Sequence, residues 1–94
     1  MGIYDDVARR LLARCQAYRD REITLESLQH AVSDASDAIV AAEESDVRQQ
    51  LLAAEARLEE IRFTVSTWRV RRKAMDVVSN LEALLRDYLP AKAP

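Results

Sequence analysis

The sequence predicts an all-α fold: a compact antiparallel (up-and-down) four-helix bundle that forms one domain over residues 1–94. Three observations lead to this prediction. Apolar side chains recur at steps of three and four residues in four successive stretches, which keeps one stripe of each helix facing a neighbour. Gly occurs once and Pro twice, so the chain has little of the turn punctuation that strands require. The connections are short, which favours antiparallel neighbours.

The first helix is expected over residues 3–19. Its apolar stripe consists of Tyr4, Ala8, Leu11, Cys15 and Tyr18. Asp5 and Asp6 lie in the first turn, where the helix macrodipole favours anions. Cys15 is the single cysteine, which excludes an internal disulfide, and its place in the stripe predicts a small core residue.

The second helix is expected over residues 25–42, with Thr24 as its N-cap. Ile23 before the cap and Leu28 after it match the spacing of a hydrophobic staple. Ser and Asp residues at positions 33–37 are poor helix formers in a helix interior. This helix is therefore expected to depend on packing more than the others do.

The third helix is expected over residues 46–65, and Ser45 or Asp46 can cap it, Asp46 in a capping box with Gln49. Strong helix formers dominate this stretch. Its apolar stripe consists of Val47, Leu51, Ala54, Leu58, Ile61 and Val65. From this regular stripe we expect the third helix to be the central one, against which the others pack.

The fourth helix is expected over residues 67–89, and Pro90 ends it. Its apolar stripe consists of Val70, Ala74, Val77, Leu81, Leu84 and Tyr88. This stripe does not continue the preceding one, because the residue seven positions after Val65 is an arginine. The shift in phase favours a turn, with Ser66 or Thr67 as the cap. The alternative is a single bent helix over residues 46–89.

The chain lacks the residues that most kinds of catalytic site require. His30, the only histidine, falls on the polar face of the second helix, and one His with one Cys cannot form a zinc site. Gly2 is the only glycine, so no Gly-rich phosphate loop exists. We therefore expect no enzyme, and no catalytic, metal or cofactor site. The longest apolar run, at 38–42, is too short to span a membrane, and no signal peptide is evident, so the expected location is cytoplasmic.

Charge is distributed unevenly along the chain, although the net charge is only −2. Residues 23–46 contain no Lys or Arg and carry six carboxylates: Glu26, Asp34, Asp37, Glu43, Glu44 and Asp46. Carboxylates near a helix C-terminus oppose the macrodipole, so local stability does not explain Glu43 and Glu44. The block is either a solvated face or a docking surface for a cationic partner. We take its six residues as the candidate partner contacts.

A basic run, Arg69, Arg71, Arg72 and Lys73, opens the fourth helix. It could contact phosphate backbones. However, the run is short, Trp68 is the only aromatic residue beside it, and the chain as a whole is acidic. We therefore favour a salt-bridged rim between this run and the acidic block. Trp68 lies off both apolar stripes, and we expect it either to plug the end of the bundle, which we favour, or to be an exposed interface anchor.

Two passages, 21–28 (REITLESL) and 54–65 (AEARLEEIRFTV), occur together on this all-helical chain. In order and spacing they resemble small immunity proteins of bacterial contact-dependent growth inhibition and related polymorphic-toxin systems, in layout over most of the chain. The resemblance implies a cytoplasmic protein that binds one cognate toxin domain and blocks it. Many such toxins are nucleases, which are basic because they hold phosphate backbones, and an acidic block suits such a partner. These immunity proteins share no common binding motif, so the resemblance assigns no role to any residue.

We accordingly expect an immunity protein that neutralises a toxin domain, in the favoured version a nuclease, by stoichiometric binding. This expectation involves no cofactor, no membrane and no direct contact with nucleic acid, and it leaves the oligomeric state open. Two alternatives remain. One is a structural or adaptor bundle that self-associates, and the other is a small nucleic-acid-associated regulator that uses the basic run.

Overall fold

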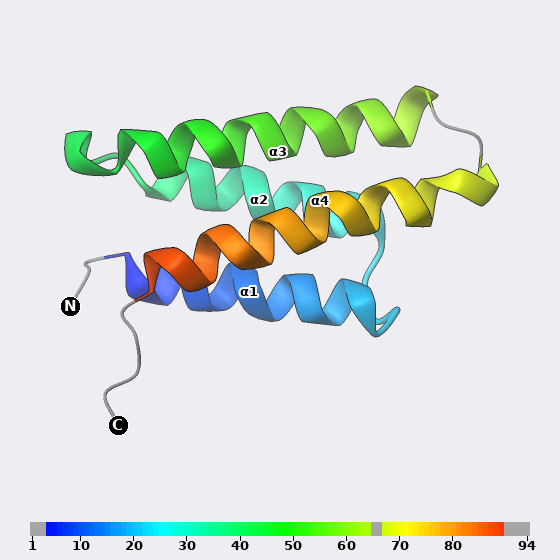
Figure 1. The fold of residues 1–94 in the computed structure, drawn as a ribbon, viewed down its shortest axis with the longest axis horizontal. Helices are drawn as coiled ribbons and strands as arrows, with labels where there is room; N and C mark the ends of the chain where they lie inside the picture. Colours follow the sequence, from blue (N-terminus) through cyan, green and yellow to red (C-terminus); the bar gives the residue numbers. More distant parts are fainter. Residues whose placement is uncertain (1–3, 65–66, 90–94) are drawn as a thin grey trace.

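The computed structural model describes residues 4–64 and 67–89, and within them every regular element is helical. The elements are α1 (Asp5–Arg19), α2 (Leu25–Ala38), a short 3₁₀ helix η1 (Ala42–Glu44), α3 (Ser45–Thr64) and α4 (Thr67–Tyr88). The four α-helices run alternately up and down along one long axis (Figure 1). The predicted four-helix bundle is confirmed. Because α3 and α4 run in opposite directions, the single bent helix is excluded.

The helices form a closed ring around the core. Helix α1 packs against α2 and α4, and α3 packs against the same two helices. The prediction that the third helix is central is therefore wrong, because each helix has two main neighbours. A regular apolar stripe shows which way a helix faces but not how many partners surround it. Only three residues of α3 are fully buried: Leu51, Leu58 and Ile61.

One hydrophobic cluster joins all four helices. Its buried members from α1 and α2 are Ala8, Leu11, Cys15, Tyr18, Leu28, Val32 and Ala35. Those from the rest of the chain are Ile39, Leu51, Leu58, Ile61, Ala74, Val77, Val78, Leu81 and Leu85. Cys15 is fully buried, as predicted. Thr24 caps α2 as predicted, because its hydroxyl accepts a hydrogen bond from the Ser27 amide at 3.1 Å.

Helix α2 ends at Ala38, four residues before the predicted end at residue 42. Ile39 leaves the helix with φ −92° and ψ 91° while keeping its side chain in the core. The Tyr4 hydroxyl, at the start of α1, then accepts hydrogen bonds from the amides of Val40 (3.2 Å) and Ala41 (2.9 Å). These contacts replace the helical partners that the two amides would otherwise have. The prediction failed because the acceptor is far away in sequence.

The predicted start of the third helix needs a small correction, whereas the predicted start of the fourth helix at residue 67 is confirmed. Helix α3 begins at Ser45, directly after η1, so Asp46 lies inside the helix rather than before it. The Arg48 side chain reaches back from α3 and donates to the Ser36 carbonyl, near the end of α2. Helix α4 begins at Thr67. The predicted stripe residue Val65 and the predicted cap Ser66 lie outside the described residues.

Helix α1 ends in a Schellman-type turn. The Glu22 amide donates to the Ala17 carbonyl at 2.8 Å, and Arg21 occupies the left-handed region at φ 62°. This conformation is costly for a residue with a Cβ atom. Arg71 of α4 supports the turn, because its guanidinium donates to the carbonyls of Tyr18 (3.2 Å) and Arg19 (2.7 Å).

A charged pair links α1 to α4 beside this turn. The Arg19 guanidinium donates to both carboxylate oxygens of Glu82, at distances from 2.6 to 3.0 Å, and to the Ser79 hydroxyl. The Glu82 residue is only 5% exposed, so the loss of Arg19 would leave a buried carboxylate without its cation. Because the fork of Arg19 fits one position along α4, the pair specifies how the two helices align.

Replacing Tyr4 tests the contact that ends α2. Tyr4→Phe removes the acceptor for two amides and should lower the free energy of unfolding by about 1–2 kcal/mol, measured by urea denaturation. Tyr88→Phe is the matched control, because the buried Tyr88 hydroxyl forms no hydrogen bond of good geometry with the described residues. Its removal should leave stability unchanged or slightly raised. Equal losses in the two variants would contradict the assigned role of Tyr4.

Replacing Glu82 tests the charged pair. Glu82→Ala leaves Arg19 without its carboxylate and should lower the free energy of unfolding by about 2–3 kcal/mol. The double variant Arg19→Met/Glu82→Leu replaces both charges with apolar groups and should recover most of that loss. Thermal and urea unfolding measure both changes. If the double variant is less stable than Glu82→Ala, the expectation is contradicted. The ion pair would then contribute more to stability than apolar side chains do at the same two positions.

Candidate functional site

Five of the six predicted contact residues gather toward one end of the bundle. Asp34 and Asp37 lie in the last half of α2, Glu43 and Glu44 form most of η1, and Asp46 lies in the first turn of α3. We call these five residues the acidic end. All are exposed except Glu44, which is half-buried. They are brought together because α2 ends early and the chain turns directly into α3.

Glu26, the sixth predicted contact, lies apart from this group. It occupies the first turn of α2, at the opposite end of the bundle, and a nitrogen of Arg62 lies 3.7 Å from its carboxylate. Arg62 also donates to Gln29, whose amide donates in turn to Glu55 at 2.8 Å. Glu26 therefore belongs to a network that joins α2 to α3. The acidic block is continuous in sequence, but it extends along the whole of α2. Glu26 at the start of this helix and the carboxylates near its end therefore lie on different surfaces.

The carboxylates of the acidic end are largely free of internal neutralisation. Throughout residues 4–64 and 67–89, no ion pair of this chain includes any of the five. Asp34 is the most screened, because it lines a shallow hollow together with Arg10 and Arg14 of α1. Surface carboxylates without cationic neighbours produce a negative field that reaches into the solvent.

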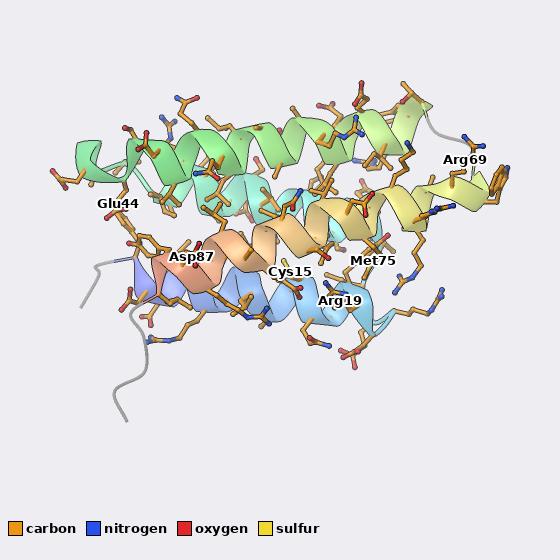
Figure 2. All side chains as sticks on the ribbon, in the orientation of Figure 1. Cys15, Arg19, Glu44, Arg69, Met75 and Asp87 are labelled. Carbon is orange, nitrogen blue, oxygen red and sulfur yellow. The ribbon has the colours of Figure 1, made fainter. Side chains whose placement is uncertain are left out.

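Further acidic groups surround this end of the molecule. Figure 2 shows Asp87, near the end of α4, at the same end of the bundle as Glu44. Asp5, in the first turn of α1, is 4% exposed, and its carboxylate oxygens have no hydrogen-bond partner among residues 4–64 and 67–89. Burial raises the pKa of Tyr88, and the negative charges of Glu44 and Asp5 raise it further. Asp5 and Asp87 therefore add carboxyl groups beside the five residues of the acidic end.

Trp68, the predicted interface anchor, is exposed. The favoured prediction that it plugs the end of the bundle is wrong, because 74% of the residue is accessible to solvent. The Arg69 guanidinium lies over its ring, 4.6 Å from the centroid. Phe63, near the end of α3, is also 70% exposed and lies under Arg62 at 4.8 Å. Sequence reasoning overlooked Phe63, although its position two residues after Ile61 already placed it off the apolar stripe.

The predicted salt-bridged rim between the basic run and the acidic block is also wrong. Arg71 binds backbone carbonyls of α1, and Arg69, Arg72 and Lys73 are exposed at the start of α4. In the described part of the chain no ion pair connects this run to an acidic group. Figure 2 shows why: Arg69 and Glu44 lie at opposite ends of the bundle.

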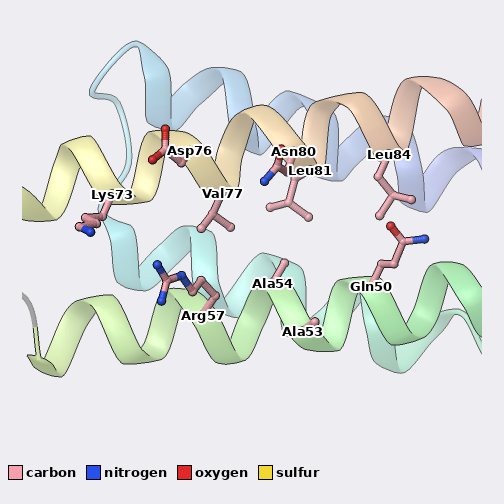
Figure 3. A pocket seen from close by; sticks show the side chains of 10 residues that line it. All are labelled: Gln50, Ala53, Ala54, Arg57, Lys73, Asp76, Val77, Asn80, Leu81 and Leu84. Atoms are coloured by element: carbon pink, nitrogen blue, oxygen red, sulfur yellow. The ribbon is translucent and has the colours of Figure 1, made fainter.

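A groove of about 390 Å³ runs between α3 and α4 (Figure 3). It forms because Ala53 and Ala54 are too small to fill the space beside α4. Its remaining lining residues are Gln50, Arg57, Lys73, Asp76, Val77, Asn80, Leu81 and Leu84. The charges along its edge have both signs, and Arg57 is already paired with Glu60 at 2.6 Å. The groove therefore lacks the converging polar groups of a catalytic or cofactor site.

Cys15 and His30 occupy contrasting environments. Cys15 is buried in the core, where desolvation raises the pKa of its thiol from 9.0 to about 12, with a further contribution from the Glu82 charge. His30 is exposed, as predicted. Among the described residues, no three His, Cys, Asp or Glu side chains are close enough to bind a metal ion together. Nor does any described helix combine the length and apolar character needed to cross a membrane.

Comparison of the chain with protein-family models, with curated proteins and with solved structures found no match.

The raised pKa of Cys15 predicts a thiol that does not react while the chain is folded. A disulfide reagent at pH 8 should leave Cys15 unmodified in buffer and modify it fully in urea. The free energy of unfolding should also fall as the pH rises above about 9, because only the unfolded thiol ionises between pH 9 and about 12. Rapid modification of the folded chain would contradict this burial.

Proposed function

We propose that this chain is a bacterial immunity protein, which binds one cognate toxin domain in the cytoplasm and neutralises it stoichiometrically. The observation that carries the proposal is the acidic end: five carboxylates on adjoining segments, without internal ion pairs among the described residues. The resemblance in layout to small helical immunity proteins agrees with this proposal. A basic nuclease domain is the toxin that this charge suits best.

The proposed inhibition requires recognition but no reaction by this chain. A nuclease holds its substrate with Lys and Arg side chains aimed at phosphates. The acidic end offers carboxylates to the same cations, so its binding would exclude nucleic acid from the toxin. Carboxylates accept such contacts as short, charge-assisted hydrogen bonds. The fold supports this role because α2, η1 and α3 hold the five residues on a backbone that Tyr4 and Arg48 fix in place.

Charge of this kind acts mainly on the rate of encounter. Complementary fields can raise association rate constants from about 10⁶ to 10⁸ M⁻¹s⁻¹ or more at low salt. An immunity protein benefits from such a rate, because it must capture a toxin before the toxin reaches its substrate. Affinity beyond this steering requires buried contacts around the charges. Half-buried Glu44 and exposed Val40, which is 70% accessible, are available for such contacts at this end.

Neutralising the acidic end tests this assignment. The probe is the C-terminal domain of the protein encoded directly upstream, which the proposal requires to be a large secreted protein. The test variant carries Asp34→Asn, Asp37→Asn, Glu43→Gln, Glu44→Gln and Asp46→Asn. It should bind the toxin domain about 100-fold more weakly in stopped-flow and calorimetric titrations, mostly through slower association. Cells that express it should lose protection against the toxin.

The matched control changes the net charge by the same amount elsewhere on the molecule. It carries Asp20→Asn, Glu22→Gln, Glu59→Gln, Glu60→Gln and Asp76→Asn, all at exposed positions. This control should bind within about threefold of the unchanged chain. Equal weakening of the two variants would sink the assignment to the acidic end. Absence of toxin binding by the unchanged chain would sink the immunity function itself.

A further inference from the structure

We propose that the opposite end of the bundle binds single-stranded nucleic acid through exposed aromatic rings and free cations. Trp68, Arg69, Arg72 and Lys73 line one hollow at the start of α4, and Phe63 lies near the end of α3 at the same end of the bundle. We call these five residues the basic tip. It is separate from the acidic end and does not depend on the proposed immunity function. Figure 1 shows that α3 and α4 extend beyond α1 and α2 at this end, so the tip projects from the bundle.

Two aromatic rings are accessible on the basic tip. Trp68 is 74% exposed and Phe63 is 70% exposed, although such side chains are usually buried. Arg69 covers one face of the Trp68 ring, and Arg62 covers one face of the Phe63 ring. A base can stack on the face opposite each guanidinium. Base–aromatic stacking of this kind tolerates any sequence, because every base has a π face.

The cations of the basic tip are available to phosphates. Arg69, Arg72 and Lys73 are exposed and form no ion pair with the described residues. Together with Trp68 and Asp76 they line a hollow of about 380 Å³. Arg71, by contrast, donates hydrogen bonds to backbone carbonyls at the end of α1. Three cations of the run are therefore available to a ligand. Three positive charges beside exposed rings match the components of single-strand binding sites.

The sequence alone counted against nucleic acid on three grounds, and the structure removes two of them. Phe63, one residue before the end of α3, is a second exposed aromatic residue, so Trp68 is not the only one near the α3–α4 junction. The acidic end lies at the other end of a molecule 41 Å long, whereas the Debye length at physiological salt is about 8 Å. The charges of the acidic end are therefore screened from the tip. The third ground, the short length of the basic run, still applies, and it limits contact to about three phosphates.

A lipid surface fits the basic tip less well than a nucleic acid does. Insertion into a bilayer would take the rings below the headgroups and draw the stacked guanidinium groups with them, which is costly. Stacking against a base leaves those guanidinium groups beside phosphates, where they are favourable. An acidic polypeptide could satisfy the cations but has no flat groups that would use both rings.

Fluorescence of Trp68 provides a direct test, because it is the only tryptophan of the chain. The probes are 12-nucleotide deoxythymidine and uridine oligomers, titrated in 50 mM salt. Stacking should quench the emission of the full-length protein, and anisotropy of labelled oligomers should give the same dissociation constant. Raising the salt from 50 to 200 mM should weaken binding roughly 20-fold for about three phosphate contacts. Poly-glutamate and phosphatidylglycerol vesicles are the comparison ligands.

Variants then connect the binding to the basic tip. Arg69→Gln/Arg72→Gln/Lys73→Gln should remove the salt-dependent part of binding, and Trp68→Ala should weaken anisotropy-detected binding about tenfold. The matched control is Arg9→Gln/Arg10→Gln/Arg14→Gln, which removes three exposed cations of α1. It should bind as the unchanged chain does. Circular dichroism melts establish that each variant is folded.

Four results would overturn the proposal. One is the absence of quenching and of anisotropy change with either oligomer at 50 mM salt. The second is equal weakening in the two triple variants, which would indicate general charge attraction. The third is tighter binding of poly-glutamate than of the oligomers. The fourth is a blue shift of Trp68 emission on vesicles without binding of the oligomers. None of them bears on toxin binding by the acidic end.

Discussion

The hydroxyl of Tyr4 accepts hydrogen bonds from the amides of Val40 and Ala41, and the arrangement of the acidic end depends on this contact. It satisfies two amides that leave the helix after Ile39 and thus allows α2 to stop at Ala38. The chain then forms η1 and enters α3 within a few residues. Without this stop, a continued helix would direct Glu43 and Glu44 along the axis of α2 instead of across the end of the bundle.

The same architecture separates the charges of the chain. Up-and-down helices bring the end of α2 and the start of α3 to one end of the bundle, and the α3–α4 junction to the other (Figure 1). The five carboxylates of the acidic end lie at the first end, and the exposed cations Arg69, Arg72 and Lys73 lie at the second. Internal pairs such as Arg19–Glu82 and Arg62–Glu26 occur where charges from different helices meet. The carboxylates of the acidic end, and Arg69, Arg72 and Lys73 at the other end, form no ion pair among the described residues, so they are available to other molecules.

The fold could be predicted from the sequence because burial on a helix is periodic. Four stripes of apolar residues predict four helices, and the phase shift after α3 predicts the turn that separates it from α4. Thr24 and Cys15 were also predicted correctly, since capping and stripe position are local properties. The end of α2 was not, because the decisive acceptor, Tyr4, is about 36 residues away in sequence.

The candidate site could be predicted only in part, for a related reason. The six carboxylates are close together in the sequence, but α2 runs the length of the bundle and separates Glu26 from the other five. Glu26 is instead paired with Arg62. Trp68 and Phe63 lie off the apolar stripes, but stripe position alone does not reveal whether the end of a bundle is covered. The basic run does not form the predicted rim, because bundle topology directs it away from the acidic end.

The most direct measurement of the central claim is an NMR titration of the ¹⁵N-labelled chain with the toxin domain encoded upstream. If the acidic end is the binding surface, amide shift changes should concentrate in residues 34–46 and leave the Trp68 indole resonance in place. Shift changes that concentrate on α1, on the α3–α4 groove or on the basic tip, with residues 34–46 unperturbed, would contradict the account.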